Sequence, residues 1–356
     1  MGSRSSGGSS LSCSFLLRVL SGLLPLLVAA GGTLSAQRGE PCPDPADRSP
    51  PSFAAGALAG TRWLFQLQEA SPIEIAATTF DTVVMDYSTD GTEAGRYGAG
   101  ALAVLKAGGA RQALAYLSIG EAEDYRYYFQ PGWLSRSGGP PGGQAPCWLS
   151  RRNPQWKGNY KVQYWSQDWQ RIVLGYLDRI IGDGFDGVYL DIVDAYLYWS
   201  DPGNGESFSL SEGEAAARMI NLVQRIAFQA RAVRRKPDFL IVPQNGEGLL
   251  DYDQGFGGLE AGGYLKTIDG IGVEDLYYDR TRAQNVEAIA LRKQYLDRIK
   301  AAGKKVVVLD YVDDGSRPVR AIVGEFLRRA RSDGFFPYAA RTDRALDCIN
   351  VFPGQP

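Results

Sequence analysis

The fold of this chain is decided by the stretch Gly184-Phe185-Asp186-Gly187-Val188-Tyr189-Leu190-Asp191, in which a glycine turn leads into a short apolar strand that ends on a carboxylate. Strands that are buried on both faces of a parallel sheet have continuous apolar sequences of this kind. In an eight-stranded α/β barrel, the carboxyl ends of such strands build the active site. We therefore expect Asp191 at an active-site rim, although a single Asp in this position could equally cap a helix or a turn.

Repetition of the pattern favours the active-site interpretation. Five further apolar runs end on a carboxylate, and these carboxylates are Asp86, Glu121, Glu247, Glu274 and Asp310. Bringing so many carboxylates to one rim costs stability through desolvation and mutual repulsion, so a purely structural role explains them poorly. The six strand ends together predict a carboxylate-lined cleft.

The order of elements predicts an α/β fold with a single (β/α)8 TIM barrel. The expected strands lie near residues 61–67, 82–87, 113–119, 184–191, 239–243, 270–274, 305–311 and 335–338. Apolar residues at helical spacing predict helices near 99–107, 168–181, 212–234, 285–301 and 319–331. We place the barrel domain at residues 60–345, after a Pro-rich linker or N-terminal arm at 37–59 and before a C-terminal tail at 346–356.

A long insertion follows the third predicted strand. Residues 121–166 carry ten aromatic side chains, a density that argues against disorder. Structured loops of this length usually serve a function, and flat aromatic rings suit the faces of sugars. We expect part of this set to contact a carbohydrate; the alternative is a loop that packs on itself.

Composition restricts the chemistry sharply, because the 356 residues include no histidine. Ser-His-Asp and Cys-His catalysis and imidazole metal sites are therefore excluded, and acid–base work falls to carboxylates. An oxygen-only Ca²⁺ or Mg²⁺ site remains open, but the sequence contains no EF-hand or phosphate-binding glycine loop, so we predict no cofactor and no metal. The net charge of −2, without a long basic run, also disfavours nucleic acid as a partner.

The first 36 residues have the composition of a secretory signal peptide. Arg4 and Arg18 precede an apolar run from Val19 to Ala30, and small residues follow to Ala36. This run is short for a membrane span, which disfavours the alternative of an uncleaved anchor. We expect a secreted protein, extracellular or periplasmic, with no stable membrane insertion after cleavage, and we expect it to be a monomer.

Removal of the signal peptide leaves Cys42, Cys147 and Cys348 in a compartment that permits disulfides. One bridge and one free thiol is the simplest outcome for three cysteines. We predict a Cys42–Cys348 bridge, because the ends of a barrel lie near each other and this bridge would close a long loop.

A carboxylate-lined rim without histidine points to glycoside hydrolysis. That reaction needs one carboxyl group that is protonated and one that is ionised. Retaining enzymes hold the two groups roughly 5 to 5.5 Å apart, a spacing that adjacent strands can provide. The ends of the fourth and fifth predicted strands offer Asp191 and Glu247.

Several motifs together resemble glycoside hydrolase family 114, which includes endo-α-1,4-polygalactosaminidases. They are Trp63 with Gln66-Leu67, Met85-Asp86-Tyr87, Tyr116-Leu117-Ser118-Ile119-Gly120-Glu121-Ala122, the stretch 184–191, Pro243-Gln244-Asn245-Gly246-Glu247 and Gly272-Val273-Glu274. The resemblance runs from about Gly60 to Ala340. It implies a TIM barrel and an endo-acting retaining hydrolase of α-1,4-linked galactosamine-containing polysaccharide, such as galactosaminogalactan.

The resemblance also implies the site residues. Asp191 would be the nucleophile and Glu247 the acid/base, although the sequence is compatible with the reverse order. Glu121 and Glu274 would bind an amino or hydroxyl group of the substrate. Further substrate-binding residues at the same rim would be Asp86, Tyr87, Tyr116, Gln244, Asn245 and Asp310.

Charge supports the same substrate class, since a protonated amino sugar is cationic and is attracted to an acidic rim. We therefore expect a cationic polysaccharide as the partner. Two alternatives remain open at this point: a glycosidase for another α-galactose or N-acetylgalactosamine chain, and a carbohydrate-binding barrel without catalysis. A metal-dependent polysaccharide deacetylase is disfavoured, because its usual imidazole ligands are missing.

Overall fold

The computed structural model describes residues 58, 60, 62–107, 109, 111–134, 142–255 and 260–352. The predicted signal peptide and nearly all of the predicted linker lie outside these ranges. The predicted barrel strands are present as parallel strands: β1 (Trp63–Gln66), β2 (Thr82–Met85), β3 (Gln112–Ser118), β7 (Gly187–Asp191), β8 (Leu240–Pro243), β9 (Gly270–Glu274), β12 (Lys305–Asp313) and β13 (Phe336–Arg341). The predicted α/β class is confirmed.

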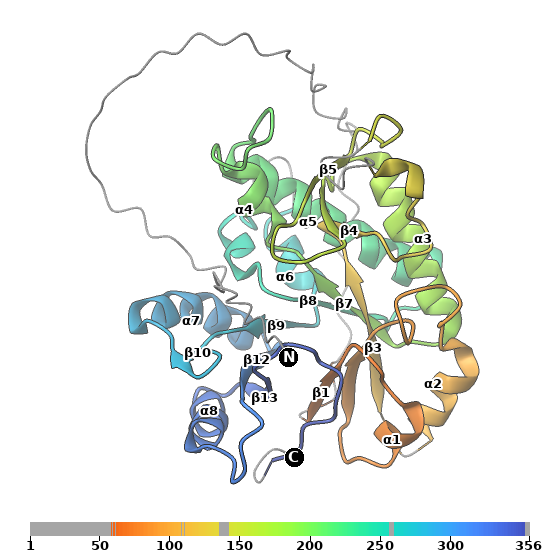
Figure 1. Cartoon of the computed structure of the whole chain (residues 1–356). Helices are drawn as coiled ribbons and strands as arrows, with labels where there is room; N and C mark the ends of the chain where they lie inside the picture. The colour runs from red at the N-terminus through yellow and green to blue at the C-terminus, as the bar shows by residue number, and fades with distance from the viewer. Residues whose placement is uncertain are drawn as a thin grey trace, which may run out of the picture.

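The strands form two hydrogen-bonded sheets. One has the order β1-β2-β3-β7-β8 and the other the order β9-β12-β13 (Figure 1). Between β8 and β9 the ladder is reduced to one bridge, Gln244 with Gly272, and to backbone hydrogen bonds from Asn245 to Gly272 at 2.8 Å and from Asp269 to Ile241 at 2.9 Å. β13 packs beside β1. Among the described residues no ladder joins β13 to β1, so the backbone hydrogen bonds do not run around the whole ring.

The chain beyond β13 returns to the end of β1. The carbonyl oxygen of Leu346 accepts hydrogen bonds from the backbone N–H groups of Leu67 at 2.9 Å and Gln68 at 3.1 Å. The Gln66 side chain adds a donor to the carbonyl oxygen of Asp347 at 3.2 Å. These contacts tie the segment that follows β13 to the first strand.

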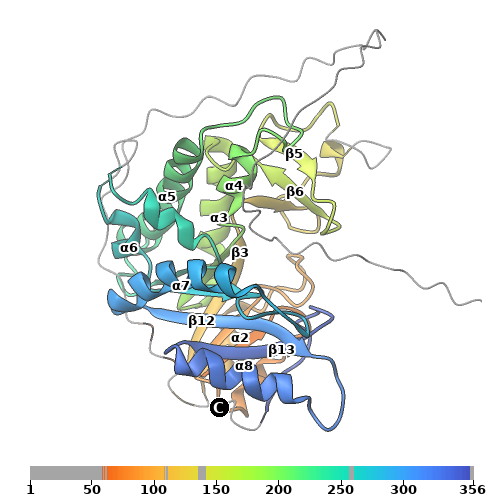
Figure 2. The ribbon, with the colours of Figure 1, turned by 90° about the vertical axis from the view of Figure 1, so that its left-hand side faces the viewer.

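Helices cover the outside of the strands (Figure 2). The long ones are α2 (Gly98–Lys106), α3 (Gln167–Asp183), α5 (Glu212–Phe228), α7 (Val286–Ala301) and α8 (Ala321–Ser332). Their ends follow capping chemistry: Gly184 ends α3 in the left-handed conformation, and the Ser211 hydroxyl accepts from the Glu214 N–H at the start of α5. The predicted helix 212–234 continues beyond α5 as a π-helical turn, η2 (Gln229–Val233).

Three short helices were not predicted: α1 (Pro72–Ala76), α4 (Ala195–Ser200) and α6 (Gly263–Thr267). A two-stranded hairpin of β10 (Tyr278–Asp279) and β11 (Arg282–Ala283) was also missed. The segment containing α4 lies between the predicted strand 184–191 and the predicted helix 212–234. It forms a helix because Tyr196 and Trp199 lie on one face and are buried, a pattern too short to identify from sequence.

Aromatic side chains fill part of the barrel interior. The Phe65 ring meets Tyr189 edge-on at 5.1 Å between centroids, and it lies 5.8 Å from the Tyr338 ring. The Tyr189 hydroxyl reaches across to Gly272, where an added Cβ would lie only 1.8 Å from it. Glycine at 272 therefore makes room for Tyr189 below the carboxyl ends of the strands.

The predicted aromatic-rich insertion after the third barrel strand is confirmed, and it is folded. It contains an antiparallel sheet of β4 (Glu121–Glu123), β6 (Asn159–Val162) and β5 (Leu149–Arg152), with a 3₁₀ turn, η1 (Pro131–Trp133). Most of its rings pack on one another, as in the edge-to-face pair Trp133–Trp148 at 5.2 Å. Only Tyr125 and Trp156 among the large apolar side chains described in this insertion are strongly exposed, at 41% and 50%.

The predicted disulfide is wrong. Cys147 is disulfide-bonded, whereas Cys348 is a free thiol whose Sγ lies 3.5 Å from Asn350 Oδ1. The prediction relied on the proximity of barrel ends, but the insertion takes the bridge instead. Within the described ranges, no helix combines the length and apolar character that crossing a membrane requires.

Candidate active site

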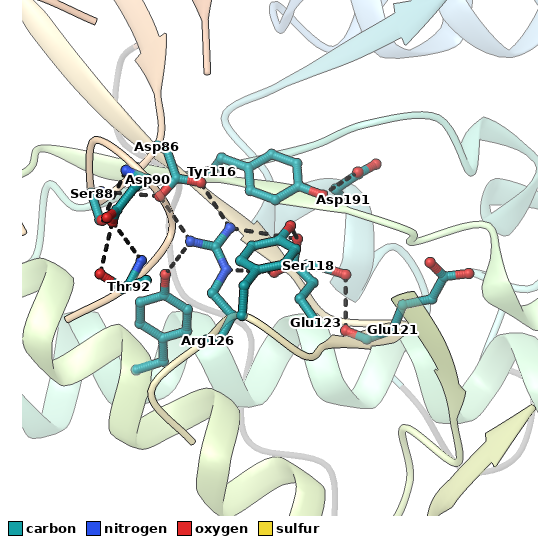
Figure 3. Close-up of polar contacts among 12 residues, drawn as sticks. Asp86, Ser88, Asp90, Thr92, Tyr116, Ser118, Glu121, Glu123, Arg126 and Asp191 are labelled. Atoms are coloured by element: carbon teal, nitrogen blue, oxygen red, sulfur yellow. Dashed lines mark hydrogen bonds and ion pairs between the residues drawn. The ribbon is translucent and has the colours of Figure 1, made fainter. Parts of the chain in front are cut away.

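Asp191 lies at the carboxyl end of β7, level with Ser118 of β3. Both carboxylate oxygens accept hydrogen bonds: Oδ2 from the Tyr116 hydroxyl at 2.7 Å and Oδ1 from the Ile192 N–H at 2.8 Å. Tyr116 comes from β3, two residues before Ser118, and its side chain points to Asp191 (Figure 3). Neighbouring parallel strands thus place a donor directly on this carboxylate.

The surroundings of Asp191 favour its neutral form. Burial and the nearby charge of Glu274 raise its pKa to about 8, against the hydrogen bonds from Tyr116 and Ile192, which lower it. Asp194 adds a smaller repulsion. In the free protein at neutral pH, Asp191 therefore holds a proton most of the time.

Glu247 follows β8 and begins a 3₁₀ turn, η3 (Glu247–Asp251). Gly246 precedes it in the left-handed conformation, with φ +69°, which turns the chain at the strand end. The Glu247 side chain is buried and forms an ion pair with the Nε of Arg292 from α7. Burial would lower the pKa of Arg292, but the charge and hydrogen bond of Glu247 raise it above its usual value.

Glu274 ends β9 on the other side of the β8–β9 junction. Its Oε2 accepts a hydrogen bond from the Tyr311 hydroxyl at 3.1 Å and lies 3.9 Å from Nη1 of Arg344. Asn245 connects the two strand ends, because its Oδ1 accepts from the Glu274 N–H and from Arg292 Nη2, both at 3.2 Å. Gln244 donates its backbone N–H to the Leu190 carbonyl at 2.7 Å.

Four carboxylates influence one another at this end of the barrel. Asp191 is affected by the charges of Glu274 and Asp194. The pKa of Asp194 is itself raised by burial and by the charges of Glu121 and Glu247, and Lys161 opposes this rise. Asp191 therefore lies within electrostatic range of Glu274 and Asp194, and Asp194 lies within range of Glu247.

Four other predicted site residues already form ion pairs or hydrogen bonds with other residues of this chain. The buried Glu121 pairs with Lys161 at 2.5 Å, and Asp86 pairs with Arg126 at 2.7 Å. The Tyr87 hydroxyl donates to Glu93 at 2.7 Å, and its ring packs on Tyr176 of α3. Asp310 is fully buried and accepts three backbone N–H groups, from Leu276, Tyr277 and Tyr278, each at 2.9 Å.

Arg126 is a buried cation that the sequence analysis missed. Its guanidinium lies between Asp86 and Glu123, with the Tyr176 hydroxyl 3.0 Å from Nη1, and it sits 5.9 Å from the centre of the Tyr116 ring (Figure 3). It thus connects the loop after β2, the insertion and the ring that carries the Asp191 donor. No local pattern marks this arginine, since its partners come from distant segments.

Arg292, Arg344, Lys161 and Tyr189 were also missed. Only Tyr189 had a sequence signal, because it lies two residues before Asp191 on the same strand and so on the same face. Its hydroxyl is buried without a hydrogen-bond partner among the described residues, and burial together with the charges of Glu274 and Asp191 raises its pKa well above the usual value.

The chemistry of this arrangement is that of two carboxyl groups in different environments. Burial and like charges raise the pKa of Asp191 to about 8, whereas Glu247 forms an ion pair with Arg292. In the described ranges, no group of three or more His, Cys, Asp or Glu side chains is arranged to hold a metal ion. Paired carboxyl groups that differ in this way are the machinery of acid–base and nucleophilic catalysis on glycosides.

Comparisons with known proteins identify the family to which the chain belongs. The model of glycoside hydrolase family GH114 matches residues 44–355. An uncharacterized protein of Thermotoga maritima is 41% identical over 297 residues, which cover 83% of this chain and 85% of that protein. The glycoside hydrolase domain of PelA from Pseudomonas aeruginosa superposes with a TM-score of 0.56 at 18% identity, covering 82% of this chain and 98% of that chain.

A crystal structure of Aspergillus fumigatus Ega3 in complex with galactosamine is also similar. It has a TM-score of 0.54 at 16% identity, and the match covers 84% of this chain and 95% of that chain. At such identities the two solved structures establish a shared fold. That fold agrees with the predicted TIM barrel.

Proposed function

Because the chain belongs to glycoside hydrolase family 114, we propose that it cleaves α-1,4-linked galactosamine-containing polysaccharide at internal bonds, by a two-carboxylate retaining mechanism. The observation that supports this most directly is the environment of Asp191, which receives the Tyr116 hydroxyl and faces the charge of Glu274. Galactosamine in the similar Ega3 structure supports the choice of sugar.

In the proposed reaction, Asp191 attacks the anomeric carbon while Glu247 gives a proton to the departing glycosidic oxygen. A covalent glycosyl-Asp191 intermediate forms and the bond to the leaving chain breaks. Glu247, now a carboxylate, takes a proton from water, and this water attacks the anomeric carbon and releases Asp191. Tyr116 supports Asp191 by donating to the oxygen that regains negative charge in this second step.

A positively charged substrate favours the ionised form of Asp191, which the free protein disfavours. Asp191 must be ionised to attack, yet burial and Glu274 raise its pKa to about 8. An ammonium group bound beside Glu274 offsets that repulsion and favours the ionised Asp191. Asp191 loses one proton and Glu247 must carry one, so the two carboxyl groups together hold a single proton when the reaction begins.

We also propose that the protein acts outside the cytoplasm, after removal of residues 1–36. The disulfide at Cys147 supports this location, because structural disulfides form and persist in oxidising compartments.

The test is to incubate the protein from Gln37 onward with partly deacetylated α-1,4-galactosaminogalactan and to follow oligosaccharide release by mass spectrometry. Asp191→Asn and Glu247→Gln are assayed in parallel, and fully N-acetylated polymer is the matched substrate control. We expect mixed-length oligosaccharides from the wild type, loss in both variants, and little release from the acetylated polymer. Binding of the polymer without release would contradict catalysis, and equal cleavage of both polymers would contradict the cationic substrate.

A further inference from the structure

The junction between β8 and β9 has few backbone hydrogen bonds, and side chains add to them. The two strands share the bridge between Gln244 and Gly272, and backbone N–H groups donate from Asn245 to the Gly272 carbonyl at 2.8 Å and from Asp269 to the Ile241 carbonyl at 2.9 Å. Glu247 follows one side of this junction and Glu274 ends the other. The relative position of these two carboxylates therefore depends on the side chains that join the two strand ends as well as on these few backbone bonds.

Arg292 makes that connection with all three of its guanidinium nitrogens. Nε pairs with the Glu247 carboxylate, Nη2 donates to Asn245 Oδ1 at 3.2 Å, and Nη1 donates to the Glu274 main-chain carbonyl at 3.0 Å. The first two partners lie after β8 and the third lies at the end of β9. One side chain from α7 thus spans the junction.

We propose that Arg292 is a positioning residue, which fixes the Glu247 carboxylate against the end of β9 so that it meets the glycosidic oxygen in the correct geometry. This inference rests on the proposed function of Glu247. An arginine suits the task because its planar fork holds several acceptors in fixed directions, whereas lysine offers only a compact charge on a flexible stem. The ion pair occupies Glu247 Oε1, so in this proposal Oε2 is the oxygen that carries the proton.

The same helix offers a matched control. Arg298 of α7 also contacts η3, with Nη1 3.3 Å from Asp251 and Nη2 3.2 Å from the Leu250 carbonyl. Its contacts tie α7 to η3 without touching Glu247, Asn245 or Glu274. A purely structural effect of loosening α7 should therefore appear in Arg298→Gln as well.

The test compares Arg292→Gln, Arg292→Lys and Arg298→Gln on two substrates. One is a galactosamine oligosaccharide with a natural sugar leaving group, and the other is the same oligosaccharide with a dinitrophenyl leaving group. The dinitrophenyl group leaves without a proton from the acid, so kcat/KM for this substrate, which reports the first step, depends little on the position of Glu247. Glu247→Gln is included as the reference for complete loss of the acid, and thermal unfolding is measured for every variant.

On the natural leaving group we expect Arg292→Gln to lower kcat by about 100-fold with KM changed less than about 3-fold, since small misplacements of a catalytic group cost this much. Arg292→Lys should recover about 10-fold of that loss by keeping one hydrogen-bond donor to Glu247. On the dinitrophenyl substrate the loss in kcat/KM should shrink to less than about 5-fold, and Arg298→Gln should stay near wild type on both.

Several outcomes would overturn the inference. Equal losses on the two substrates would mean that Arg292 does not act through proton donation, and a loss no larger than that of Arg298→Gln would mean a structural role. Both outcomes leave wild-type cleavage intact, so the proposed function would stand. A wild type that cleaves neither substrate, or a fully active Glu247→Gln, would instead overturn the proposed function and the role of Arg292 with it.

Discussion

Asp191 is the residue whose protonation the surrounding structure controls most clearly. With a pKa of about 8 in the free protein, it must lose a proton before it can act as a nucleophile. We therefore expect kcat/KM to rise with pH through this region, because kcat/KM reports the free enzyme. Replacing Glu274 by Gln removes a repelling charge and should move this acidic limb to lower pH.

This experiment also separates the two possible role orders. If Asp191 were the acid, kcat/KM would fall as pH rises through the same region. The limb that shifts in Glu274→Gln belongs to a group near Glu274, whereas titration of the substrate amine would be the same in both proteins. The measurement is kcat/KM against pH from about 5 to 10 with wild type and variant.

Asp191 should also make stability depend on pH in a direction opposite to that of an ordinary salt-bridged carboxylate. Its pKa is raised from an ordinary 3.8 to about 8 in the fold, so the folded state binds a proton that the unfolded state has lost. Stability then decreases as pH rises between these values. Asp191→Asn removes this decrease and should raise Tm at pH 8 relative to pH 5, by roughly 2–4 °C for each kcal/mol relieved. Equal Tm differences at the two pH values would contradict the raised pKa.

The Tyr116 hydroxyl is the side-chain donor to Asp191, and its removal should weaken catalysis without unfolding the protein. Hydrogen bonds to charged groups contribute about 1.5–3 kcal/mol, so Tyr116→Phe should lower kcat by roughly 10- to 150-fold. Tyr97→Phe is the control, because that hydroxyl donates to the Ala70 carbonyl at 2.7 Å, away from the carboxylates. A Tyr116→Phe variant as active as the control would show that this bond does not support the nucleophile.

For individual residues, the sequence indicated candidate site residues where a carboxylate directly follows an apolar strand. Asp191, Glu247 and Glu274 were predicted in this way; in the structure Asp191 accepts from Tyr116 and is affected by the charge of Glu274, whose N–H donates to Asn245. The same rule cannot tell which strand-end carboxylates already accept hydrogen bonds from the nearby backbone. Asp310 resembles Asp191 in sequence, but the backbone amides of residues 276–278 occupy it.

At the scale of elements, the barrel strands were readable because burial on both faces demands continuous apolar sequences. The insertion was not, since its three strands have only three or four residues each and depend on one another for pairing. Its aromatic density was correctly linked to order. Most of the rings, however, build the core of the insertion and leave two exposed.

The two exposed rings of the insertion, Tyr125 and Trp156, carry the next prediction. If they bind sugar units of a long substrate, Trp156→Ala and Tyr125→Ala should raise KM for the polymer by about 5- to 150-fold, given about 1–3 kcal/mol for stacking on an aromatic ring. Short oligosaccharides should be affected less. Val233→Ala is the control, since this exposed side chain precedes β8 at the opposite end of the strand. Unchanged KM for polymer would mean that these rings contact no substrate.

At the scale of the whole molecule, the pairing of the cysteines could not be predicted from the sequence. The pairing depends on where the insertion folds back, which no spacing in the sequence encodes. Cys147→Ser should destabilise the protein by about 2–5 kcal/mol, whereas Cys348→Ser should be close to neutral because its thiol is free. Thermal unfolding with and without reductant measures both, and thiol counting on the unfolded protein should show Cys348 as reactive. A stabilising bridge at Cys348 would contradict this structure.

The β8–β9 junction divides the barrel into two units, a five-stranded and a three-stranded sheet, which are joined there by few backbone hydrogen bonds and by side chains. Local opening follows boundaries with few backbone hydrogen bonds, so amide hydrogen exchange near this junction, as near the β13–β1 boundary, should exceed exchange within either sheet. Glu247 and Glu274 stand on opposite units. Mild denaturant should therefore separate them, and activity should vanish before circular dichroism records any loss of helix.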